Sequence, residues 1–398
     1  MASQDITPVG ADSAKVSLLN DPRIRGYIYQ AVVLAVIFGV GYWVVNNTIA
    51  NLQRAHLASG FGFLDGRSGF DISSHPFTNY SSDSTYITAL YVGFLNTLLV
   101  AVAGIITATF LGFIIGVGRL SHNWLIRKLC TVYVEVFRNI PPLLVIFFWY
   151  SGVLAILPQA RQSIALPFST YLNNRGFFFP VPVFGEGAWL AGVAFVVALI
   201  GTFFVRRWAY KRQMATGQQF PVLWTAAALI IGLPLLAFGL KGFPLTFDRP
   251  VLGAFNLSGG SLVGPEFMSL YLALSFYTAS FIAEIVRSGI RGVGRGQSEA
   301  AHALGLRAGT TTRLVVVPQA MRIIIPPLSS QYLNLTKNSS LAVAVGYPDL
   351  FAVGGTILNQ TGRSIEVVAI FIIVYLSLSV ATSLFMNWFN AKMALVER

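Results

Sequence analysis

Seven long apolar runs constrain the fold of this chain more than any other feature of its sequence. A helix needs about 20 apolar residues to cross the hydrocarbon core of a bilayer, and each run meets or approaches that length. Of the 398 residues, 55% are hydrophobic and only 11% are charged, a balance unusual for a soluble domain. The sequence therefore predicts an all-α polytopic membrane protein. The runs cover approximately residues 27–46, 88–117, 129–157, 187–205, 222–240, 267–290 and 365–389.

An eighth span at 323–345 is too polar to be found from hydropathy, because it contains Lys337, Gln331 and several Asn and Ser residues. The distribution of basic residues favours it. With eight spans and a cytoplasmic N-terminus, 17 Lys and Arg residues fall in cytoplasmic segments and seven in external ones, as the positive-inside rule requires. We therefore expect about eight transmembrane helices and two cytoplasmic termini. The net charge of +12 then reflects topology, and a nucleic-acid partner is not expected.

Three basic residues remain inside predicted spans, and two acidic residues accompany them. Glu135 precedes Arg138 by three positions, and Glu284 precedes Arg287 by the same spacing, so each pair shares a helical face. A charge at bilayer depth costs about 2.5 to 3.5 kcal/mol on insertion scales, which favours a functional role. Structural pairing near the helix ends is the alternative, and for the polar run around Lys337 it is hydrogen bonding between helices. The candidate pathway residues are Glu135, Arg138, Glu284, Arg287, Asn334, Lys337, Asn338, Ser339 and Ser340.

The sequence contains no motif of an enzyme or a resident cofactor. It has no phosphate-binding loop of the form G-x-x-x-x-G-K-[ST], so ATP hydrolysis by this chain is not expected. Cys130 is the single cysteine, and the histidines are scattered over predicted loops, so no metal site is expected. The four histidines are His56, His75, His122 and His302.

Residues 296–327, "GQSEAAHALGLRAGTTTRLVVVPQAMRIIIPP", interrupt the apolar pattern between two spans. Ser298 is a candidate N-cap, and Glu299 would then lie in the first helical turn, where its charge complements the helix dipole. Ala300, Ala301, Ala303 and Gly305 give the short helix a smooth face. A helix of this kind has no use in lipid, so we expect it to dock against a cytoplasmic partner protein.

"EAAHALGLRAGTTTRLVVVPQAMRI" resembles the EAA loop of permease subunits in binding-protein-dependent ABC importers. "LNTLLVAVAGIITATFLGFIIGVGRLS", "YVEVFRNIPPLLVIFFWY", "SFYTASFIAEIVRSGI" and "NLTKNSSLAVAVGYPDLF" are similar to the polar amino acid branch, and the larger general L-amino-acid permeases are the nearest type. The resemblance implies the five-helix core of a type I ABC importer, with an added N-terminal anchor and an inserted helix pair. The coupling residues it implies are Ser298, Glu299, Ala300, Ala301, His302, Gly305 and Pro318.

The expected organisation follows from this resemblance. Residues 1–87 hold the cytoplasmic N-terminus, first span and a long external loop. Residues 88–157 and 267–398 form the two parts of the core, with the coupling loop at 291–322, and 158–266 form the insert. Implied partners are a second permease subunit in a heterodimer, two ATPase subunits that bind ATP and Mg²⁺, and a periplasmic amino-acid-binding protein. The implied location is the bacterial inner membrane.

Two alternatives compete with the importer subunit. An ion-coupled secondary transporter or channel would use the buried charges as a relay, but it would not need the docking helix. A scaffold subunit would leave those charges without a use. Dependence of transport on ATP separates the first alternative from the importer.

Overall fold

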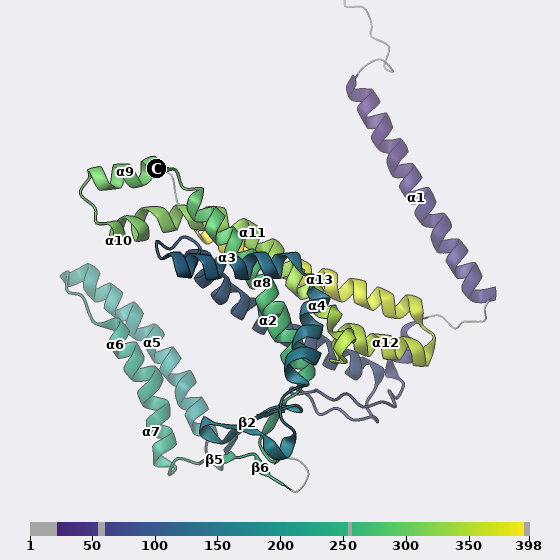
Figure 1. Ribbon diagram of the computed structural model, residues 1–398, viewed down its shortest axis with the longest axis horizontal. Coiled ribbons are helices and arrows are strands. Elements are labelled where there is room, and N and C mark those ends of the chain that lie inside the picture. Colours follow the sequence, from purple (N-terminus) through teal and green to yellow (C-terminus); the bar gives the residue numbers. More distant parts are fainter. Residues whose placement is uncertain (1–21, 55–59, 254–256, 394–398) are drawn as a thin grey trace, which may run out of the picture.

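The computed structural model describes residues 22–54, 60–253 and 257–393, and most of them are helical (Figure 1). Six helices in these ranges are long and apolar enough to cross a membrane, and two bent helix pairs pass the same test together. The described residues therefore hold up to eight spans, as the sequence predicts. The six are α1 (Pro22–Arg54), α2 (Tyr86–Gly118), α5 (Trp189–Thr216), the stretch from α6 (Val222–Ala227) to α7 (Leu233–Leu240), α8 (Pro265–Arg291) and α13 (Ser364–Met393).

The two ends of α8 distinguish the two ends of the molecule. The short helix α9 (Arg295–Ala303) follows the C-terminal end of α8, and the strands lie at its N-terminal end (Figure 1). We call these the α9 end and the strand end.

Small residues bring α2 and α8 into close contact at the centre of the fold. Gly104, Ala108, Gly112 and Gly116 are spaced by four, so they form one stripe on α2. A β-carbon at Gly112 would lie 2.5 Å from a methyl group of Ile282, and one at Gly116 would lie 2.7 Å from a backbone carbonyl of α8. Such stripes are common between membrane helices. In lipid the hydrophobic effect does not drive helices together, so close packing must do so.

The run predicted as one span at 129–157 is instead two helices at a sharp angle. α3 (Trp124–Asn139) and the stretch formed by α4 (Pro142–Phe147) and a π-helical segment (Phe148–Leu154) are bent by 112°. Pro141 and Pro142 explain the break, because a residue before proline is pushed out of the helical region. Ile140 has the expected extended backbone, with φ −104° and ψ 133°.

The polar eighth run lies inside a longer helical stretch. After α10 (Ala308–Thr311) and a π-helical segment, α11 (Val317–Asn338) and a 3-10 turn (Ser339–Val345) lead to α12 (Leu350–Thr361) at an angle of 54°. Pro326 and Pro327 lie within α11 without ending it. The chain turns at Gly346, whose positive φ of 76° suits a residue without a β-carbon.

The N-terminal part is a separate helix followed by an ordered segment. α1 is exposed along its length and is drawn apart from the other helices (Figure 1). The loop predicted after the first span is shorter than expected, because α1 continues to Arg54. Residues 60–85 pack on α2 and α12 through Ile72 and Tyr80. Tyr80 donates to the Phe70 carbonyl at 2.9 Å, and burial raises the pKa of its phenol, so it stays a donor.

The insert contains strands that the sequence did not predict. α5 packs against the α6–α7 stretch, and short antiparallel strands connect this hairpin to the core at the strand end (Figure 1). Each strand has only two to four residues, too few to show an alternating pattern in the sequence. One sheet has the order β1 (Ile164–Leu166), β2 (Thr170–Asn173), β3 (Gly176–Phe179), β8 (Ser261–Val263), and the pairs are β4 (Val181–Phe184) with β5 (Leu245–Asp248) and β6 (Val251–Leu252) with β7 (Leu257–Ser258).

Candidate functional site

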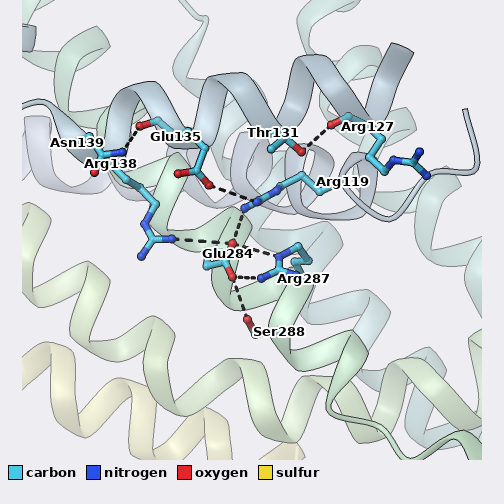
Figure 2. A network of polar contacts seen from close by, with 9 residues as sticks. All are labelled: Arg119, Arg127, Thr131, Glu135, Arg138, Asn139, Glu284, Arg287 and Ser288. Atoms are coloured by element: carbon cyan, nitrogen blue, oxygen red, sulfur yellow. Dashed lines mark hydrogen bonds and ion pairs between the residues drawn. The ribbon is translucent and has the colours of Figure 1, made fainter. Parts of the chain in front are cut away.

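A cluster of charged side chains joins α2, α3 and α8 near the α9 end (Figure 2). Glu284 is at its centre, where its carboxylate pairs with Arg119 and Arg287. Arg138 Nη1 lies 3.9 Å from Glu284 Oε2, and Arg119 Nη2 lies 3.6 Å from Glu135 Oε1. Three guanidinium groups thus face two carboxylates, so the cluster carries one excess positive charge.

The two predicted pairs differ in outcome. Glu284 and Arg287 pair within α8 as predicted, and Arg287 Nε donates to Glu284 Oε2 at 3.1 Å. Glu135 and Arg138 do not pair with each other: Glu135 faces Arg119, and Arg138 faces Glu284. Packing of α3 on α8 supplies partners on other helices.

Arg119 belongs to the cluster, although the sequence predicts it to be one of the 17 basic residues of the cytoplasmic segments. Its side chain is only 9% exposed. It follows Gly118 directly, at the end of the small-residue stripe that holds α2 against α8. A stripe of small residues that ends in an arginine is the sequence signal that could have identified it.

The cluster lies near a helix end rather than at mid-depth. Glu284 precedes the last residue of α8, Arg291, by roughly 10 Å at 1.5 Å per residue. This position suits the alternative that these charges hold α2, α3 and α8 together. A role of Glu135, Arg138, Glu284 and Arg287 in a substrate pathway stays a prediction.

A second group of polar side chains lines a cavity between α8 and α11. Gln331, Asn334 and Asn338 share one face of α11, at spacings of three and four residues. They face Tyr277 and Thr278 across a cavity of about 300 Å³. These amide and hydroxyl groups can donate and accept hydrogen bonds. The cavity lies roughly at the middle of α8, because Tyr277 is near the centre of that helix.

The other predicted pathway residues are not on this cavity. Lys337 is exposed, and among the described residues it has no ion-pair partner. Ser339 is buried and donates to the Thr336 carbonyl at 2.7 Å. Ser340 donates to the Lys337 carbonyl at 2.8 Å. Both hydroxyls therefore bond to the backbone of their own turn.

The predicted docking helix is present as α9, but it begins earlier than expected. Its first residue is Arg295 and its N-cap is Gly294. The prediction that Ser298 caps the helix and that Glu299 lies in its first turn is therefore wrong, because glycine, which also suits an N-cap, occupies that position. Ser298 and Glu299 instead line a cavity of about 760 Å³ between α9 and the end of α8.

Gly305 ends α9 for a conformational reason. Its φ is 77°, its N–H donates to the His302 carbonyl at 2.9 Å, and the Leu306 N–H donates to the Ala301 carbonyl at 3.1 Å. These two bonds form the Schellman motif, which favours glycine in the left-handed region. A side chain here would strain the helix end as well as any partner contact.

The surface of α9 is open to a partner. Ala301 is buried, whereas Ala300 and His302 are exposed, and Leu304 is 82% exposed. Gln319 Nε2 donates to Gln297 Oε1 at 3.2 Å, which ties α9 to the start of α11. The last predicted coupling residue, Pro318, occupies the first turn of α11, where its missing N–H is tolerated.

The protein family described as "Binding-protein-dependent transport system inner membrane component" matches residues 191–395. This range includes α8, α9 and α11, and it also includes all but the first two residues of the α5–α7 hairpin.

Three curated relatives match nearly the whole chain. The General L-amino acid transport system permease protein AapQ of Rhizobium johnstonii is 67% identical over 99% of this chain and 98% of its own length. The Putative amino-acid ABC transporter permease protein YhdX of Escherichia coli is 48% identical, with 95% and 96% covered. The Glutamate/glutamine/aspartate/asparagine transport system permease protein BztB of Rhodobacter capsulatus is 41% identical, with 96% of each covered. These matches favour a permease subunit over an ion-coupled carrier.

Proposed function

Because the chain belongs to the family of binding-protein-dependent transport system inner membrane components, we propose that it is the permease subunit of an ATP-driven amino acid importer. The names of the three relatives support amino acids as the substrate class. The proposal places the protein in a bacterial inner membrane, with the α9 end and both termini cytoplasmic and the strand end external.

The proposed cycle needs partners that supply delivery and energy. A binding protein delivers an amino acid at the strand end, and a second permease subunit completes the pathway. Two ATPase subunits bind ATP and Mg²⁺ and change the conformation of the permease pair through α9. ATP can drive this change only because the conformations differ in affinity for it. On this chain, the amides of Gln331, Asn334 and Asn338 would contact the passing substrate.

The exposed α9 is the observation that carries the proposal. This nine-residue helix joins two spans and exposes Ala300, and Leu304, which directly follows the helix, is exposed as well. Gln319 links the helix to α11, so a movement of α9 can be transmitted to that helix. Since this chain has no nucleotide-binding loop, the force must come from another subunit.

Reconstitution tests the proposal. The chain, the second permease subunit and the ATPase subunits are placed in proteoliposomes with the binding protein, and L-glutamine uptake is measured. We expect uptake only with ATP on the ATPase side. Uptake that follows a proton or sodium gradient without ATP would instead establish the ion-coupled carrier.

A variant of α9 sharpens this test. Leu304→Asp should loosen the ATPase subunits and lower uptake at least tenfold, because a charge replaces an apolar contact at a docking surface. Leu304→Met keeps the contact apolar and serves as the control. Equal ATPase retention by both variants during purification would remove α9 as the docking helix.

A further inference from the structure

A cavity of about 530 Å³ lies at the strand end, where residues 60–85, the inserted sheet and the start of α8 meet. It is at the opposite end of α8 from the charge cluster and α9 (Figure 1). Its size is within the range of roughly 300–1,000 Å³ typical of small-molecule pockets. The residues that line it include Ser74, Tyr150, Arg175, Glu266, Phe267 and Tyr347.

The sheet fixes Arg175 at the edge of this cavity. Arg175 lies in the turn between β2 and β3, and its N–H donates to the side-chain oxygen of buried Asn173 at 2.8 Å. Asn173 also donates to Ser163 Oγ at 2.8 Å. Gly176 closes the turn with φ 126°, and a β-carbon there would lie 2.2 Å from the Val263 carbonyl. These hydrogen bonds and this close contact therefore fix the position of the turn relative to β8.

The same sheet brings an opposite charge close to Arg175. Phe177 on β3 pairs with Val263 on β8, and the chain runs from β8 through Gly264 into α8. Glu266 is in the first turn of α8, and Gly264 leaves room for its carboxylate: a β-carbon there would lie 2.8 Å from Glu266 Oε2. Among the described residues, neither the Arg175 guanidinium nor the Glu266 carboxylate has an ion-pair partner.

A buried asparagine fixes two other residues that line the cavity, Ser74 and Pro348. Asn96 on α2 donates to the Ser74 carbonyl at 2.7 Å and to the Pro348 carbonyl at 2.9 Å. Phe267 stacks on Tyr271 with ring centroids 5.8 Å apart, and it also contacts Tyr347. The cavity thus combines a rigid aromatic side with one free cation and one free anion among the described residues.

We propose that this cavity is an entry site for a zwitterionic amino acid, in which Arg175 binds the α-carboxylate and Glu266 accepts hydrogen bonds from the α-ammonium group. Guanidinium binds carboxylate through two parallel hydrogen bonds, and a carboxylate is acceptor only, so the two side chains match the two charges of the ligand. The aromatic rings that line the cavity would contact the side chain of the amino acid. The site rests on the proposed function, and it would receive the substrate before the membrane pathway does.

Equilibrium binding to the complete transporter in nanodiscs, without the binding protein, tests the site. The probe is radiolabelled L-glutamine, and the competitors are 4-aminobutanamide, which lacks the α-carboxylate, and glutaramate, which lacks the α-ammonium group. Arg175→Gln and Glu266→Gln should each weaken L-glutamine binding tenfold or more. Arg175→Gln should leave the affinity for 4-aminobutanamide unchanged, and Glu266→Gln should leave that for glutaramate unchanged.

Matched controls remove an exposed charge elsewhere at the strand end. Arg249→Gln and Glu186→Gln should bind L-glutamine as the parent does, because neither residue lines the cavity. Elution of each variant as an intact complex in size-exclusion chromatography excludes misfolding.

The possible failures are distinguishable. If the parent complex with its binding protein imports L-glutamine on ATP, but Arg175→Gln and Glu266→Gln bind it as the parent does, the entry site is refuted and the proposed function stands. Equal weakening of L-glutamine and both competitors in either variant also refutes the charge pairing. If the parent complex shows no ATP-driven uptake of L-glutamine or other L-amino acids, the proposed function itself fails.

Discussion

The Glu284 carboxylate is the only acidic group within 4 Å of Arg287 among the described residues, and it also faces Arg119 and Arg138. One carboxylate thus balances side chains from three helices. The ion pairs themselves contribute less to stability than the removal of such a carboxylate would cost. Its loss would leave partly buried cations without a partner.

Glu284→Gln should therefore destabilise the protein by about 1–3 kcal/mol, the cost of leaving buried polar groups unsatisfied. The glutamine amide keeps the shape of the glutamate carboxylate but removes its charge. The midpoint of thermal unfolding of the purified complex measures the effect, and Glu186→Gln, which removes an exposed carboxylate, is the control. An unchanged midpoint for Glu284→Gln would show that the cluster does not hold the three helices together.

Lys337 behaves differently, because no acidic group among the described residues pairs with it. Lys337→Met should assemble with normal yield, since it leaves no buried acid without a partner and removes a charge that is costly in lipid. If the ammonium serves the substrate, uptake should fall at least tenfold and Lys337→Arg should recover part of it. Normal uptake by Lys337→Met would remove this residue from the pathway.

At the scale of elements, contact between α2 and α8 depends on the absence of side chains. Gly112 and Gly116 let the two backbones approach, and this approach positions Arg119 beside Glu284. Close packing and charge pairing are therefore linked along one helix interface.

Gly116→Ala tests this link. The added methyl group would meet the Ala283 carbonyl, which is backbone and cannot rotate away, so we expect a loss of about 1–3 kcal/mol from overpacking. Gly355→Ala on α12 is the matched control, because a β-carbon there meets nothing within 4 Å. In that control the same substitution should be neutral or slightly stabilising. Equal thermal midpoints for the two variants would contradict the close approach.

At the scale of the whole molecule, the helices give the chain two different ends. The charge cluster, α9 and the basic C-terminal part of α5 lie at one end, and the strands and residues 60–85 lie at the other (Figure 1). The count of basic residues predicts that the α9 end faces the cytoplasm.

Cysteine labelling tests this orientation. In a Cys130→Ala background, single cysteines at exposed Ser81 and Gln162 should react with an impermeant maleimide in intact cells whose outer membrane has been permeabilised. A cysteine at exposed Gln219 should react only after lysis. The reverse pattern would invert the proposed topology.

The six to eight candidate spans, the polar eighth segment and the short helix α9 were all predictable from the sequence, because apolar length, basic residues and small-residue composition are local properties. Two details of those elements were missed. The break at Ile140 had a local signal in Pro141 and Pro142, but the continuous apolar length of the run outweighed it in the prediction. The start of α9 depends on which of several cap-compatible residues the preceding turn presents. The partners of Glu135 and Arg138, the role of Arg119 and the cavity around Arg175 and Glu266 were decided only by the tertiary structure. Each joins residues far apart in the chain, and the side chain that is nearest in space is set by helix packing and strand pairing, which sequence spacing does not encode.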